Sequence, residues 1–122
     1  MNRSEGGKLI PLRVLLLEDR ASDAELIIEA LREHGYEPDW IRVDTEADFR
    51  AQLNMPWELV LADHVLPQFS GPGALKIIHE QQLDLPFIIV SGTIGEDAAV
   101  AALHAGATDY LLKDRLARLF QG

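Results

Sequence analysis

Short apolar runs alternate with segments of helical periodicity along the whole chain. The five runs are Val14–Leu17, Trp40–Val43, Leu59–Ala62, Phe87–Val90 and Tyr110–Leu112. The first run is continuous rather than alternating, which is typical of a strand covered on both faces. The second reads as a shorter, half-exposed strand and is expected at an edge of the sheet.

The segments between these runs have the patterns of helices. Ser22 and Glu25 form a capping box for a helix that is expected to end at Gly35. Thr45 is expected to open a short helix to Leu53. The remaining two helices are expected after the turn residues Pro67, Gly71 and Gly73, with Leu75, Ile77 and Ile78 on the apolar face, and over Glu96–Ala105 before Gly106. This order predicts a doubly wound α/β fold, a five-stranded parallel sheet with helices on both faces.

A chain of 122 residues is long enough for one domain with its own core. We expect residues 1–11 to be a flexible leader and residues 12–122 to be the domain. The final stretch, Asp114–Gly122, allows only about two helical turns, which is short for a helix that spans a sheet. We therefore expect the full polypeptide to continue beyond Gly122.

The charge balance narrows the class of partner. Eleven Lys and Arg against twenty Asp and Glu give a net charge of −9, which opposes direct binding to nucleic-acid phosphates. The apolar runs are too short to cross a bilayer, and the N-terminal residues lack the apolar segment of a signal peptide. With no cysteine in the chain, these features favour a cytoplasmic domain without membrane insertion.

Polar residues end four of the five predicted strands. They are Glu18 and Asp19, then Asp63, Ser91 and Lys113. Because the carboxyl ends of parallel strands share one edge of the sheet, we expect these side chains to be neighbours.

Three carboxylates at one edge repel one another, and a single lysine cannot neutralise them. A divalent cation can, and oxygen ligands without His or Cys select Mg²⁺, with Mn²⁺ as the alternative. The arrangement indicates phosphoryl transfer with Asp63 as nucleophile, while Lys113 and Ser91 bind oxygen atoms of the transferred group.

Four segments resemble the receiver domain of two-component response regulators in order and spacing. They are Glu18-Asp19, Leu61-Ala62-Asp63 with Pro67 and Gly71 following, Val90-Ser91-Gly92, and Asp109-Tyr110-Leu111-Leu112-Lys113. The resemblance implies a flavodoxin-like fold with strand order 2-1-3-4-5. It also implies a metal held by Glu18, Asp19 and Asp63, and phosphorylation of Asp63 by a histidine kinase or a histidine phosphotransfer protein.

The same resemblance assigns further roles. It makes the backbone carbonyl of Val65 a metal ligand, and it makes Ser91 and Tyr110 the residues that move on phosphorylation. It implies a switch surface, and a possible homodimer interface, on the fourth helix, fifth strand and fifth helix. The side chains of Val65 and Thr93 stand where family members tune hydrolysis of the acyl phosphate. Such a domain phosphorylates and dephosphorylates itself and is otherwise not an enzyme.

One feature departs from the common pattern of the family, and another resembles a subgroup of it. Asp114 follows Lys113 where the family usually has proline after a cis bond, and a cis bond before another residue costs about 2.5–4 kcal/mol. The segments Ser91–Glu96 and Lys113–Leu116 resemble receivers attached to multidomain sensor kinases. The full-length chain is thus a candidate for a protein that also contains a histidine kinase domain.

Two other functions fit parts of the pattern. An unphosphorylated docking module would keep the fold without the chemistry, and the Asp114 departure leaves this interpretation open. A phosphatase with an Asp nucleophile usually has a second acid two residues further on, where this chain has Val65. His64 beside Asp63 is expected to point away from it, because adjacent residues of an extended segment face opposite sides.

Overall fold

The computed structural model describes residues 9–63, 69, 71–92 and 96–112 of the chain. Its elements are β1 (Ile10–Leu17), α1 (Ala21–Glu33), β2 (Tyr36–Val43), α2 (Glu46–Gln52), β3 (Leu59–Asp63), α3 (Gly71–Glu80), β4 (Phe87–Ser91), α4 (Glu96–His104) and β5 (Asp109–Leu112). All paired strands are parallel, and their order is β2-β1-β3-β4-β5. The predicted fold class and strand order are confirmed. None of the helices in these residue ranges is long and apolar enough to cross a membrane.

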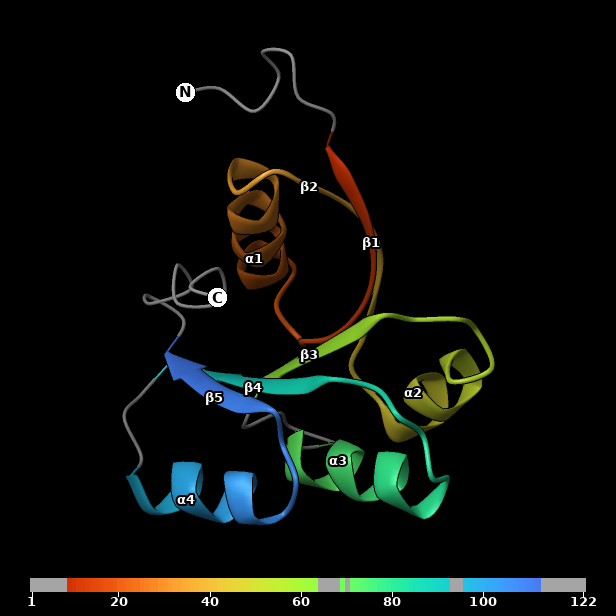
Figure 1. Ribbon diagram of the computed structural model, residues 1–122, viewed down its shortest axis with the longest axis vertical. Coiled ribbons are helices and arrows are strands. Elements are labelled where there is room, and N and C mark those ends of the chain that lie inside the picture. The colour runs from red at the N-terminus through yellow and green to blue at the C-terminus, as the bar shows by residue number, and fades with distance from the viewer. Residues whose placement is uncertain (1–8, 64–68, 70, 93–95, 113–122) are drawn as a thin grey trace.

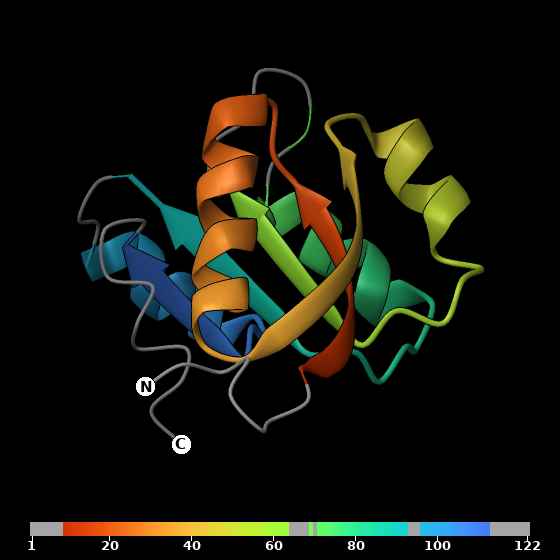
Figure 2. The same cartoon turned by 90° about the horizontal axis from the view of Figure 1, so that it is seen from above.

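The sheet separates two layers of helices, as Figures 1 and 2 show. Alternate residues of β1 face opposite layers, because successive side chains of a strand point to opposite faces. Val14 and Leu16 pack with α1, whereas Leu15 and Leu17 pack in the cluster formed with α2, α3 and α4. Burial on both faces explains why the first apolar run is continuous.

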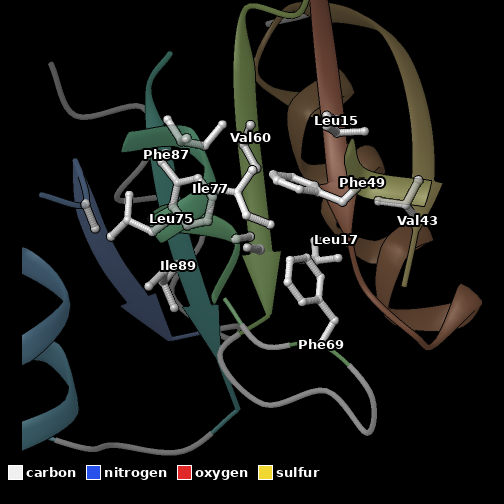
Figure 3. Packing of buried hydrophobic residues seen from close by; sticks show 14 of the residues in the cluster. Leu15, Leu17, Val43, Phe49, Val60, Phe69, Leu75, Ile77, Phe87 and Ile89 are labelled. Atoms are coloured by element: carbon white, nitrogen blue, oxygen red, sulfur yellow. The ribbon is translucent and has the colours of Figure 1, made fainter. Parts of the chain in front are cut away.

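Aromatic side chains fill the core on the α2 and α3 side. Figure 3 shows Phe49 of α2 beside Leu15 and Leu17, with Phe69 close to Leu17 at the carboxyl end of the strand. The ring centroids of Phe49 and Phe69 lie 5.6 Å apart at an interplanar angle of 53°. This contact fixes residue 69, and with it one point of the segment between β3 and α3, against the core.

Two strands begin four residues before their apolar runs, whereas the other three differ from their runs by one residue. β1 begins at Ile10, where the backbone N–H of Ile10 donates to the Gly35 carbonyl, so it starts inside the segment predicted as a leader. β2 begins at Tyr36 and alternates between half-buried and exposed positions at the sheet edge, as predicted for a half-exposed edge strand. Backbone pairing between β1 and β2 extends both strands past the apolar residues.

The helix starts differ in how well the sequence predicted them. Thr45 caps α2 as expected, since its Oγ1 accepts a hydrogen bond from the Asp48 N–H at 3.1 Å. The capping box at Ser22 is wrong: α1 begins at Ala21, and its N-cap is Arg20, which makes no side-chain capping bond. The Ala24 N–H already bonds the Arg20 carbonyl, so Ser22 lies within the first turn.

Gly106 closes α4 with a φ of +106°, and the ring of His79 from α3 lies directly over it. A Cβ at this position would overlap the His79 ring, and the left-handed backbone would strain any L side chain. Because the exposed His79 side chain can rotate away, the left-handed backbone is the stronger of the two reasons for glycine here.

We predict that Gly106→Ala lowers the free energy of unfolding by about 1–2 kcal/mol in urea denaturation, because backbone strain adds to the smaller cost of displacing the exposed His79 ring. Gly35→Ala is the matched control, since Gly35 has a φ of +95° but a Cβ added there would have nothing within 4 Å. Gly35→Ala should lower the free energy of unfolding only by the backbone strain, about 1 kcal/mol. In a His79→Ala background the cost of Gly106→Ala should fall toward that of Gly35→Ala. Equal costs with and without His79 would contradict this packing.

Candidate functional site

The carboxyl ends of β1, β3 and β4 bring the acidic and hydroxyl side chains to one edge of the sheet. Leu17 pairs with Ala62, and Asp63 pairs with Val90. Glu18 and Asp19 therefore follow β1 immediately beside the last residue of β3. The predicted meeting of strand-end residues is confirmed for these two strands.

The three carboxylates form one cluster. One ligand oxygen each from Glu18, Asp19 and Asp63 lies within 4.8 Å of the others. Glu18 is only 1% exposed, and the two aspartates are half-buried. At this separation the repulsion of one charge pair is about 1 kcal/mol in bulk water and about 3.5 kcal/mol at an effective dielectric constant of 20. A positive charge bound beside the three carboxylates would therefore relieve this repulsion and stabilise the cluster.

The turn that carries the acid pair is held by hydrogen bonds. The Glu18 N–H donates to the Val43 carbonyl at 3.0 Å, and Glu18 Oε1 accepts from the Arg20 N–H at 3.1 Å. The Arg42 guanidinium of β2 donates from Nη1 to the Glu18 carbonyl oxygen at 3.2 Å. Sequence reasoning missed Arg42, although a basic residue at the end of the strand paired with β1 was a signal available for it.

The donor set fits a small divalent cation. Mg²⁺ binds oxygens at about 2.1 Å, so ligands of an octahedral shell lie about 3 Å apart when adjacent and about 4.2 Å apart when opposite. The carboxylate oxygens of the cluster, within 4.8 Å of one another, are close to these separations. The all-oxygen chemistry favours Mg²⁺ or Mn²⁺ over metals that prefer imidazole or thiolate.

Ser91 and Tyr110 lie on the two strands beyond Asp63. Ser91 is the last residue of β4 and is 5% exposed, and it pairs with Leu112 of β5. Tyr110 is half-buried and packs against the core cluster on the α2 to α4 side. The predicted site residues Lys113, Val65 and Thr93 lie outside the described residues, as do His64 and Asp114.

Residues 14–121 match the response regulator receiver domain family over nearly the whole chain. The chain belongs to this family. Receiver domains are signalling domains, and the predicted family resemblance is confirmed.

Relatives agree with this assignment. The phosphate regulon transcriptional regulatory protein PhoB of Klebsiella pneumoniae is 31% identical over 104 residues, which cover 83% of this chain and 44% of that protein. The chain thus spans less than half the length of this curated relative. A response regulator receiver protein from Pseudomonas putida is 28% identical with a TM-score of 0.75, covering 91% of this chain and 93% of that one. The Mn²⁺-bound form of response regulator Rcp1 is 29% identical with a TM-score of 0.69, covering 91% and 88% of the two chains.

We predict that Asp19→Asn raises the free energy of unfolding by about 1 kcal/mol in the presence of a chelator, because it removes one charge from the cluster. Urea denaturation measures this change. Adding MgCl₂ should stabilise the wild type in proportion to cation binding, and the variant much less. Asp84→Asn, in an exposed position between α3 and β4, is the charge-matched control and should respond to Mg²⁺ like the wild type. A variant that loses stability in chelator, or gains as much from Mg²⁺ as the wild type, would contradict the cluster's electrostatics.

Proposed function

We propose that this receiver domain accepts a phosphoryl group on Asp63 from the phosphohistidine of a histidine kinase or a histidine phosphotransfer protein, in a reaction that requires Mg²⁺ or Mn²⁺. The observation that carries the proposal is the cluster of Glu18, Asp19 and Asp63 at the end of adjacent parallel strands, with oxygens within 4.8 Å. Such a cluster is costly to a fold unless a cation occupies it.

The transfer has a simple balance. A carboxylate oxygen of Asp63 attacks the phosphorus of the phosphohistidine, and the N–P bond breaks with its electron pair passing to the imidazole nitrogen, which takes up a proton. The product is an acyl phosphate on Asp63. Attack by water on that phosphorus later returns the carboxylate and releases inorganic phosphate. Self-phosphorylation from small donors and self-dephosphorylation are therefore the activities we propose for the domain.

Glu18, Asp19 and Asp63, with the backbone carbonyl of Val65, are the proposed metal ligands. When bound, the cation offsets the negative charge that gathers on the phosphoryl oxygens. The relative Rcp1 has been solved in a Mn²⁺-bound form, which supports the choice of a hard divalent cation.

The remaining predicted site residues take supporting roles in this proposal. Ser91 is at the end of β4, next to β3, from where its hydroxyl would donate to a phosphoryl oxygen. The Lys113 ammonium would neutralise a second oxygen. Ser91 and Tyr110 would report the phosphorylated state by changing position, while Val65 and Thr93 would set the rate of hydrolysis.

The output surface that we propose is α4 with β5 and the helix expected after it. Val100 and Leu103 of α4 are 55% and 45% exposed, so this helix presents apolar side chains to solvent. A protein partner or a second copy of the domain would bind here. We further propose that the domain acts in the cytoplasm and makes no nucleic-acid contact of its own, given its net charge of −9.

Acetyl phosphate with MgCl₂ should add one phosphoryl group to the wild type, detected by intact-mass spectrometry, and none to Asp63→Asn. The same incubation with a chelator should add none to either protein. Asp84→Asn serves as the matched control because it makes the same chemical change at an exposed acid, and it should be modified like the wild type.

Modification of Asp63→Asn to the wild-type level would contradict the assignment of the acceptor. No modification of the wild type by acetyl phosphate or by a histidine kinase would favour the docking module. Rapid multiple turnover of an unrelated phosphate ester would favour the phosphatase.

A further inference from the structure

Arg42 lies on β2 opposite Leu16 of β1, one residue before the strand ends. Its side chain is exposed overall, yet its guanidinium donates to the Glu18 carbonyl through a partly buried hydrogen bond. We propose that Arg42 is a positioning residue for the divalent-cation site: it fixes the backbone that aims the acid pair at Asp63. This inference rests on the proposed function of the acidic cluster.

The end of β2 holds both backbone polar groups of Glu18. The Val43 carbonyl accepts from the Glu18 N–H at 3.0 Å, and Arg42 donates to the Glu18 carbonyl at 3.2 Å. Because a peptide unit is planar, fixing the Glu18 carbonyl also fixes the plane that leads to the N–H of Asp19. Arg42 therefore controls the direction in which the chain enters Asp19.

The third contact of this turn is local. The Arg20 N–H donates to Glu18 Oε1 at 3.1 Å, so the carboxylate is oriented by the same short segment that Arg42 holds. Only residues 18–20 connect β1 to α1, so each hydrogen bond to this turn restrains a large part of it. Without the Arg42 contact, the acid pair would sample more conformations. Cation binding would then cost more conformational entropy.

Removing the Arg42 contact should change the affinity of the site for metal by a measurable amount. Partners that orient metal ligands typically change metal affinity by about 10- to 100-fold when they are removed. Water can replace the Arg42 donor in part, since the side chain is exposed, so we expect about the lower limit of that range.

If Arg42 acted only through its charge, its removal would change the Mn²⁺ affinity in the opposite direction. A guanidinium bonded to the turn that carries the acid pair repels an incoming Mn²⁺, so deleting it would tighten binding if charge alone mattered. Positioning predicts weaker binding instead. The direction of the change therefore separates the two roles.

The experiment is calorimetric titration of the whole chain with MnCl₂, using variants shown to be folded by circular dichroism. Arg42→Met, which keeps an unbranched apolar stem but lacks donor and charge, should raise the dissociation constant about 5- to 10-fold. Arg42→Lys, which keeps one donor and the charge, should stay within about 3-fold of the wild type. If Arg42→Met does not fold, Arg42→Ala, which also lacks donor and charge, takes its place with the same expected direction.

Arg32→Met is the charge-matched control. Arg32 pairs with Glu29 in the last turn of α1, about 17 Å along the helix from the acidic turn. The Arg32→Met substitution removes one positive charge far from the site and should leave the dissociation constant within about 2-fold of the wild type.

Unchanged or tighter Mn²⁺ binding by Arg42→Met, with normal binding by the wild type, would overturn the role of Arg42 alone. Equal weakening by Arg32→Met would also overturn it, because a change far from the acidic turn would then weaken binding as much, and general destabilisation of the fold would explain the effect. Failure of the wild type to bind Mn²⁺ would overturn the proposed metal site and this inference together.

Discussion

Repulsion among the carboxylates of Glu18, Asp19 and Asp63 is the interaction on which the site depends. Their oxygens lie within 4.8 Å of one another at one edge of the sheet, and Glu18 is almost completely buried. Each close pair carries a cost of about 1 to 3.5 kcal/mol, depending on its exposure to water. A fold that holds such a cluster is prepared for a ligand of opposite charge.

The parallel sheet is what makes the cluster unavoidable. The register of β1 with β3, and of β3 with β4, brings the residues that follow each strand to the same edge. Helices cover both faces, so the strands are fixed by the core on either side, with α1 on one face and α2, α3 and α4 on the other. The same packing that stabilises the fold thus sets the distances within the site.

The sequence predicts the parts of this structure that depend on local pattern. Continuous apolar runs indicated β1, β3 and β4, and their polar ends indicated Glu18, Asp19 and Asp63. Thr45 was a sound cap because its hydroxyl bonds a backbone N–H three residues away. Ser22 misled because the β1 to α1 turn, through the Ala24 N–H bond to the Arg20 carbonyl, starts the helix earlier than side-chain chemistry suggests. Arg42 was missed because its contact joins residues 24 positions apart in the chain.

Crystals of the protein soaked in MnCl₂ offer the most direct measurement, since anomalous scattering locates manganese without reference to any chemical assay. The account predicts an anomalous peak within about 2.5 Å of carboxylate oxygens from Asp63 and at least one residue of the Glu18 and Asp19 pair. A peak at another place on the surface, with none at the carboxyl edge of β1 and β3, would contradict it.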